Sequence, residues 1–142
     1  MRLQLLSETT DWKLDVVESY KEIAQQGARR SNELIYNKGD ELEYVTYLAF
    51  LESTRETGLK FGITVRVELI VNNDTGDAWI DWIGRGPNRH NKIDPLPGYV
   101  NLRQLLAEIA KHHQNIKYFT GNRISGMRKK HPREFRLTTN KL

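Results

Sequence analysis

Cysteine is absent from these 142 residues, which excludes a thiolate nucleophile, a disulfide framework and a cysteine-based zinc site. Proline is scarce: the chain has four, and three of them lie between residues 84 and 100. No apolar run approaches the length of a membrane span, and the short one at the N-terminus is followed at once by charges, unlike a signal peptide. We therefore expect a cytoplasmic protein that contacts no membrane.

Motifs of several enzyme classes are also missing. No Gly-x-Ser-x-Gly elbow and no phosphate-binding Gly-x-x-x-x-Gly-Lys-Ser/Thr loop occurs, which argues against a serine hydrolase or a nucleotide hydrolase. The four histidines show no spacing typical of a metal site. His112 and His113 are adjacent and so point in different directions on a helix, and His113 extends an apolar stripe in which we expect it to pack. We expect no metal.

Positive charge is concentrated near the C-terminus. The net charge is +4, but residues 121–142 hold seven basic residues and one acid, so the rest of the chain is slightly acidic. Such a patch predicts a local anionic partner, either nucleic acid or an acidic protein surface. A solvated charged end without a partner is the other interpretation. The candidate nucleic-acid contacts are Arg123, Arg128, Lys129, Lys130, Arg133 and Arg136.

The N-terminal third predicts a strand and then helices. "RLQLL" alternates as a short strand does. Residues 9–27 predict a helix with Thr9 or Thr10 as its N-cap and Gly27 where a left-handed C-cap belongs. Its apolar residues repeat at helical spacing: Val16, Val17, Tyr20, Ile23 and Ala24. Residues 28–39 are a weaker helical candidate. Residues 43–53 fit either period, and their β-branched and aromatic content favours a strand.

The central segment predicts a β-hairpin. Apolar residues alternate with polar ones from position 63 to position 71, "NNDTGD" is typical of a turn, and residues 78–83 return as a second strand. After a long loop, residues 101–113 predict a helix with Asn101 as its N-cap and Gln104 three residues on. Residues 115–121 predict another strand. Phe135 and Leu137 alternate as in a last strand.

We therefore expect a single α+β domain over residues 1–142, with a central, mostly antiparallel sheet, flanking helices and a basic C-terminal segment. The expected order of elements is β-α-(α)-β-β-β-α-β. The oligomeric state is not indicated by the sequence.

Two carboxylates are candidates for catalysis. Asp81 is surrounded by Trp79, Ile80, Trp82 and Ile83. Desolvation in such company raises the pKa of a carboxyl group, as a general base for an amine requires. Glu68, on the partner strand of the hairpin, is the second candidate. The alternative is that either residue faces solvent or, for Asp81, pairs with Arg66.

The order of elements resembles that of the GNAT acyltransferase superfamily. "AWIDWI" is similar to the fourth strand of that family, residues 84–100 occupy the place of its pyrophosphate-binding loop, "NLRQLLAEIAKHH" stands as the next helix, and "IKYFTGNRI" as the fifth strand. The family loop usually reads Arg/Gln-x-x-Gly-x-Gly/Ala, whereas only Gly98 lies near that position here.

This resemblance implies an acyl-CoA-dependent N-acyltransferase with an altered cofactor loop. Acetyl-CoA or another acyl-CoA would be the cofactor. The implied cofactor-binding residues are Gly84, Arg85, Gly86, Arg89, Lys92, Gly98 and Asn122. The alternative for this loop is a connector whose glycines permit a sharp exit from the strand. The alternative for the whole chain is a non-catalytic basic module that binds nucleic acid or acts in assembly, such as a phage or mobile-element accessory or virion protein.

Overall fold

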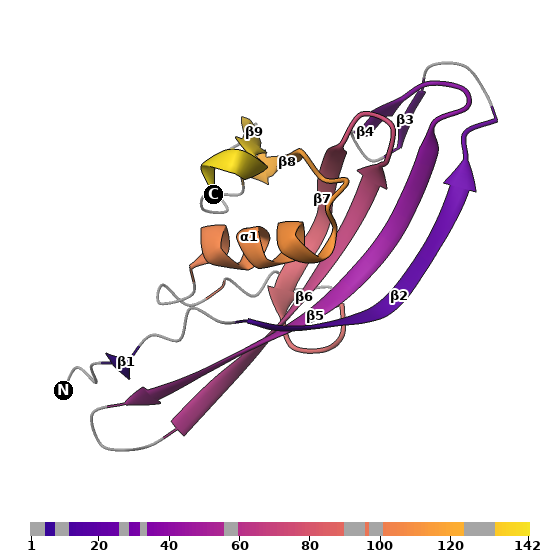
Figure 1. The fold of residues 1–142 in the computed structure, drawn as a ribbon. Helices are drawn as coiled ribbons and strands as arrows, with labels where there is room; N and C mark the ends of the chain where they lie inside the picture. Colours follow the sequence, from indigo (N-terminus) through magenta and orange to yellow (C-terminus); the bar gives the residue numbers. More distant parts are fainter. Residues whose placement is uncertain are drawn as a thin grey trace.

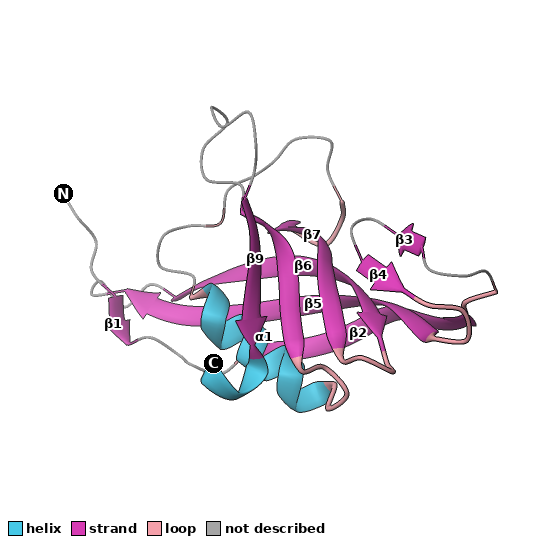
Figure 2. Ribbon diagram, turned by 90° about the horizontal axis from the view of Figure 1, so that it is seen from above, coloured by secondary structure: helices cyan, strands magenta, loops and turns pink. Residues whose placement is uncertain are grey.

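The computed structural model describes residues 5–7, 12–25, 29–31, 34–55, 60–89, 96, 101–123 and 133–142. Long strands form one mostly antiparallel sheet, and a single α-helix within these residues packs on one of its faces (Figures 1 and 2). The strands of this sheet are β1 (Leu5–Ser7), β2 (Lys13–Ile23), β5 (Glu41–Arg55), β6 (Lys60–Asn72), β7 (Asp77–Arg85), β8 (Tyr118–Arg123) and β9 (Arg133–Thr138).

The sheet order is β1-β5-β6-β7-β8-β9, and β2 also pairs with β5. All neighbours are antiparallel except β7 and β8, which are parallel and are connected through α1 (Leu102–His112). A separate small hairpin consists of β3 (Arg29–Ser31) and β4 (Leu34–Tyr36), and a 3-10 turn, η1 (Thr139–Lys141), follows β9. Within the described residues, no helix is long and apolar enough to span a membrane.

The β6–β7 hairpin confirms the period-two prediction. Val65, Val67 and Leu69 are buried, whereas Thr64 and Arg66 between them are half-buried on the other face. In the connecting turn, the Asn72 side-chain oxygen accepts hydrogen bonds from the main-chain nitrogens of residues 74 and 75, at 3.0 and 3.2 Å. Gly76 closes the turn with a φ of 82°, a conformation that glycine adopts at little cost.

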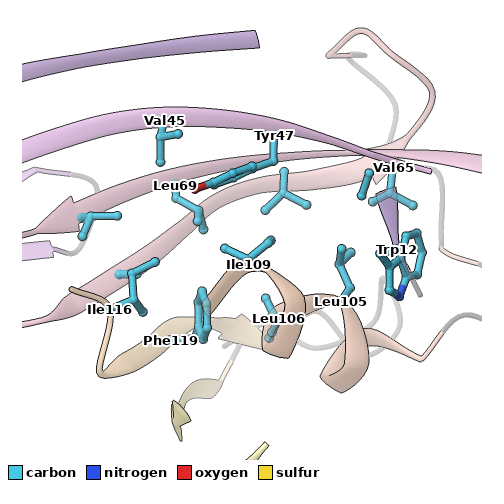
Figure 3. Close-up of a cluster of buried hydrophobic side chains, with 14 of the residues drawn as sticks. Trp12, Val45, Tyr47, Val65, Leu69, Leu105, Leu106, Ile109, Ile116 and Phe119 are labelled. Atoms are coloured by element: carbon cyan, nitrogen blue, oxygen red, sulfur yellow. The ribbon is translucent and has the colours of Figure 1, made fainter. Parts of the chain in front are cut away.

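The helix α1 covers the face of the sheet that carries Val65 and Val67, which we call the helix face. Leu105, Leu106 and Ile109 of α1 are fully buried against this face, together with Phe119 of β8 (Figure 3). The predicted N-cap is confirmed, because the Asn101 side chain accepts a hydrogen bond from the Gln104 main-chain nitrogen at 3.2 Å.

A second cluster lies on the other side of the sheet, which we call the opposite face. Leu34 of β4 is buried there with Leu42, Ile70 and Trp79. The small β3–β4 hairpin therefore covers part of the opposite face.

The expected α-helices of the N-terminal third are wrong. Residues 9–27 contain β2, and residues 28–39 contain β3 and β4, so the chain lacks the expected order β-α-(α)-β-β-β-α-β with flanking helices. The apolar residues that suggested a helical stripe are not buried as a stripe would be: Val16, Tyr20 and Ile23 are 55%, 48% and 51% exposed. Main-chain pairing of β2 with β5 overrides the local pattern.

The other expected strands are confirmed. Residues 43–53 lie within β5, residues 118–121 begin β8, and Phe135 and Leu137 lie in β9. The first expected strand, residues 2–6, overlaps β1 at Leu5 and Leu6, and its first three residues lie outside the described part of the chain.

Candidate functional site

The two predicted carboxylates lie side by side on β6 and β7. Glu68 is opposite Trp82, and the next pair is Leu69 with Ile80, so Asp81 is the extra residue of a β-bulge. A bulge redirects a side chain and interrupts the regular ladder of hydrogen bonds, and bulges are common beside active sites. The strand register thus places Asp81 at an irregular point of an otherwise regular hairpin.

Two arginines surround this pair of carboxylates. Arg66 Nε lies 3.1 Å from Glu68 Oε2. Arg89 reaches both acids, with Nη1 at 3.7 Å from Glu68 Oε1 and Nη2 at 4.0 Å from Asp81 Oδ2. Arg66 also donates to the carbonyl oxygen of Pro87 at 3.0 Å, which ties the segment after β7 to the sheet. We call Arg66, Glu68, Asp81 and Arg89 the carboxylate cluster.

The two carboxylates of this cluster have different environments. Burial raises the pKa of Asp81; the Arg89 guanidinium partly offsets this effect, and the charge of Glu68 adds to it. Glu68 has the closer cation, Arg66. The side chain of Asp81 is 22% exposed, so solvent and small molecules reach it. The arrangement suits proton abstraction by Asp81, with the Glu68 carboxylate and its Arg66 partner beside it.

The residues expected to bind a cofactor are spread over the end of β7 and beyond. Arg85 is the last residue of β7 and is exposed. Gly86 has a φ of 90°, and its main-chain nitrogen donates to the carbonyl oxygen of Thr64 at 2.8 Å. Gly84 is buried beneath the Trp82 ring: a Cβ added there would lie 2.5 Å from Trp82 Cη2. Glycine at this position therefore lets the indole lie flat against the strand.

Four further residues were expected to contact the cofactor: Arg89, Lys92, Gly98 and Asn122. Asn122 lies in β8 opposite Glu134 of β9. Lys92 and Gly98 lie outside the described residues. Arg89 was expected to contact phosphate, and the structure places it between two carboxylates with 53% of its side chain exposed.

The pairing of β7 with β8 is short. Their parallel pairing covers three residue pairs, from Asp77 with Tyr118 to Trp79 with Thr120. Among the described residues, β7 has no strand partner on this side from Ile80 to Arg85. Among the described residues, the main-chain groups on this side of β7 next to Asp81 therefore have no strand partner, at the end of β7 from which the chain leads to α1.

Of the six predicted nucleic-acid contacts, only Arg136 has a described side chain. Arg136 Nη2 lies 3.1 Å from Asp77 Oδ1, and its guanidinium lies 3.9 Å from the centre of the Tyr118 ring. Arg123 is opposite Arg133 in the β8–β9 register. Arg128, Lys129 and Lys130 lie outside the described residues.

A second polar site joins α1 to β5, and sequence reasoning missed it. His113 Nε2 lies 2.6 Å from Glu43 Oε2, and both side chains are largely buried. Ser19 donates to Glu43 Oε1 at 3.0 Å, and Asn73 Nδ2 donates to Oε2 at 3.3 Å. Burial opposes ionisation of Glu43, but hydrogen bonds from His113 and Asn73, the charge of His113 and the hydrogen bond from Ser19 together lower the pKa of Glu43.

This second site lines an open groove of about 430 Å³ between β2, β5 and the C-terminal end of α1. Ser19 donates to the carboxylate and not to the imidazole, so the three residues do not form a nucleophile and its base. As expected from the sequence, the His113 side chain points toward the sheet, like the apolar stripe of α1. Its partner lies 70 positions away, and the available signal was the position of Glu43 on the same face of β5 as Val45.

No group of three or more His, Cys, Asp or Glu side chains in the described part of the chain could hold a metal ion. Comparison with known proteins found no matching family model, no matching curated protein and no matching solved structure. The chemistry of the site must therefore be argued from its geometry.

Proposed function

We propose that this protein is an acyl-CoA-dependent N-acyltransferase in which Asp81 is the general base. The observation that carries this proposal is the position of Asp81, a desolvated carboxylate with a raised pKa on a bulge, beside the unpaired part of β7. The proposal does not depend on the order of the N-terminal elements, which differs from the expected one. In the segment on which the resemblance rests, β7 is followed by α1 and then by β8, which is the expected order of strand, helix and strand.

Transfer to an amine needs a base because an ammonium ion has no lone pair with which to attack. Asp81 would take a proton from the ammonium, and the neutral amine nitrogen would then attack the acyl carbonyl carbon. The bond from carbon to sulfur would break, coenzyme A would leave as its thiolate, and the proton that the nitrogen loses after the attack would go to that sulfur. A carboxylate whose pKa is raised by burial accepts this proton more readily than an exposed one does. Glu68, paired with Arg66, would lie beside the incoming ammonium group.

An acyl-CoA would supply the activated thioester carbonyl and a diphosphate. The residues present fit such a molecule in two respects. The side of β7 that has no strand partner among the described residues, from Ile80 to Arg85, is suited to the amides of an extended chain. Arg85 is exposed at the end of that strand, and the half-exposed Arg89 makes only long ion pairs, so both guanidinium groups are accessible to phosphate oxygens.

The test combines binding with turnover. Coenzyme A at 100 times its dissociation constant should stabilise the protein by about 2.7 kcal/mol, and Arg89→Gln should reduce the shift in melting temperature. Asp81→Asn should remove acetyl transfer to amines while coenzyme A still binds. Asp74→Asn is the matched control, because this exposed turn residue only accepts a main-chain hydrogen bond from Glu41, which asparagine can also do. No shift at millimolar coenzyme A would overturn the proposal.

A second candidate function is nucleic-acid binding through residues 121–142. The observation that favours it is the excess of six positive charges in this segment, together with the Arg136 guanidinium stacked on Tyr118. Binding should then fall steeply with salt, and each phosphate contact removed should lower the log–log slope by about 0.7–0.9. Arg128→Gln with Lys129→Gln tests this, with Lys38→Gln and Lys111→Gln as the matched control. No binding at low salt would exclude this function.

A further inference from the structure

We propose that the outer edge of β2 binds an extended, basic segment of a partner protein, which adds to the sheet as a further strand. β2 has eleven residues and pairs with β5 along one side only. Its other side has no strand partner among the described residues and forms an edge of the sheet (Figures 1 and 2). Such an edge presents a row of main-chain donors and acceptors that an extended peptide satisfies.

The side chains of this edge are unusually apolar for their exposure. Val16, Val17, Tyr20 and Ile23 are 55%, 47%, 48% and 51% exposed, and all four lie on β2. An added strand would cover part of each. Two features of β2 limit nonspecific pairing of this edge. One is the bulge between Val16 and Glu18, and the other is the presence of lysines at positions 13 and 21.

Charge identifies the kind of partner. Asp15, Glu18 and Glu22 are exposed and make no ion pair within the described residues. Their register partners on β5 are Leu48, Thr46 and Leu42, so the three carboxylates project from the opposite face of the sheet together with Tyr20. Tyr20 stacks on Tyr44, with ring centres 4.8 Å apart and ring planes 7° apart.

The setting of Tyr20 fits a cation. Burial raises the pKa of its hydroxyl, and Tyr44, Glu22 and Glu18 raise it further, as expected in a field of negative charge. Lysine and arginine side chains bind aromatic rings and carboxylates, so both parts of this surface favour the same ligand group. We call Asp15, Glu18, Tyr20 and Glu22 the acidic edge.

The helix face next to β2 has a place for the remaining side chains of such a strand. Successive side chains of a strand point to opposite faces of a sheet. Those that do not meet the acidic edge would enter the groove between β2 and the end of α1. Its walls include Val16, Ser19 and Lys21 from β2 and His112 and Asn115 from the segment at the end of α1. The partner segment therefore carries lysine or arginine at alternate positions and uncharged residues between them.

A second copy of this chain is a poorer occupant. Antiparallel pairing of β2 with itself would bring two acidic edges together on one face, and like charges across neighbouring strands destabilise a sheet. A basic strand instead places cations beside carboxylates that have no partner of their own.

The experiment uses the whole protein and three labelled eleven-residue peptides. The first alternates lysine with threonine or valine; the second has two of its threonines replaced by proline; the third has glutamate in place of lysine. Fluorescence anisotropy at low salt should show binding of the first peptide alone, because proline removes the ladder donors and glutamate reverses the charge. Amide hydrogen exchange of β2 should slow in the complex.

Variants of the protein locate the contact. Glu18→Gln with Glu22→Gln should weaken binding of the lysine peptide by about tenfold, as expected for the loss of two exposed charge contacts. Asp74→Asn with Glu108→Gln removes the same charge elsewhere and should leave binding unchanged. Equal binding of the lysine and proline peptides, unchanged exchange in β2, or no binding at millimolar peptide would each overturn the proposal. Loss of acetyl transfer in Asp81→Asn bears only on the proposed function.

Discussion

Burial of Asp81 favours its proposed role as a base but lowers the stability of the folded chain when the carboxylate is ionised. Its pKa is raised in the folded chain, chiefly by burial, so the folded chain holds this proton more tightly than the unfolded chain does. Stability therefore decreases as pH rises through the interval between the unfolded and the folded pKa, and it stays lower above that interval. Buried groups that cost stability are retained mainly where they have a function.

Asp81→Asn should therefore raise the melting temperature at pH 7. The gain should shrink as the pH falls below the unfolded pKa, because Asp81 is then protonated in both states and resembles asparagine. Denaturation of both proteins from pH 3 to pH 8 measures this difference. In Asp74→Asn, the same amide replaces an exposed carboxylate, and the melting temperature should change little. A gain that does not depend on pH would show that burial of charge at Asp81 is not the cause.

Glu43 makes the opposite prediction. Burial opposes ionisation of Glu43, but its hydrogen bonds with His113 and Asn73 lower its pKa in the folded chain. The ionised carboxylate therefore contributes stability above the unfolded pKa, near 4.5, and this stability is lost as the pH falls through the folded pKa. Glu43→Gln should cost about 2–3 kcal/mol at pH 7, because it leaves a largely buried histidine without its carboxylate. Urea denaturation with His113→Gln and the double variant gives the coupling between the two residues. A coupling near zero would contradict this role.

At the level of elements, local signals predicted local structures well. The hairpin was evident because residues 63–69 alternate strictly and "NNDTGD" supplies turn residues, and Asn72 does hold that turn. The helix was evident because Asn101 and Gln104 have capping spacing, and the predicted hydrogen bond is present. Each of these elements is specified by residues within a few positions of one another.

β2 was mistaken for a helix because its apolar residues carry little information about burial. Val16, Val17, Tyr20 and Ile23 repeat at helical spacing, yet they are about half exposed on an edge strand. A strand whose side chains are exposed on both faces need not alternate strictly. Its conformation is set by pairing with residues 41–50 of β5, which lie far along the chain and are not visible in a local window.

Only the part of the candidate site that lies within one hairpin was predictable from the sequence. Glu68 and Asp81 were identified as neighbours because they lie on the two strands of one hairpin. The contact of Arg89 with both acids depends on how the segment after β7 folds back, and no pattern indicates that. The pair of Glu43 and His113 needs the docking of α1 on β5, which is a long-range event.

The N-cap of α1 gives a prediction at this level. Asn101→Ala should lower the free energy of unfolding by about 1 kcal/mol, because it removes the acceptor for the Gln104 main-chain nitrogen. Asn101→Ser keeps a capping oxygen, so the free energy of unfolding should fall by only about a few tenths of a kcal/mol. Chemical denaturation of the three proteins measures the differences. Equal losses in both variants would mean that the asparagine contributes through something other than its cap.

In the whole molecule, the two ends of the sheet are joined very differently. β5 and β6 pair over thirteen residues, and the β6–β7 hairpin extends this ladder. β8 joins β7 through three parallel pairs, and β9 pairs with β8 alone. The burial of Phe119 and Ile116 beneath α1 is the main further attachment of this part. The candidate base thus lies where the extended part of the sheet meets a weakly paired one.

Native-state hydrogen exchange should resolve these two parts. Amides of β8 and β9 should exchange through an opening of lower free energy than amides of β5 and β6, because fewer main-chain pairs must break. Arg136→Gln should speed exchange in β8 and β9, since this arginine joins β9 to Asp77 of β7 and covers Tyr118. Arg85→Gln, which removes an exposed arginine from the end of β7, is the control and should leave this exchange unchanged. Exchange of all four strands through one common opening would mean that the three pairs of β7 and β8, with Phe119, unite the sheet into a single cooperative unit.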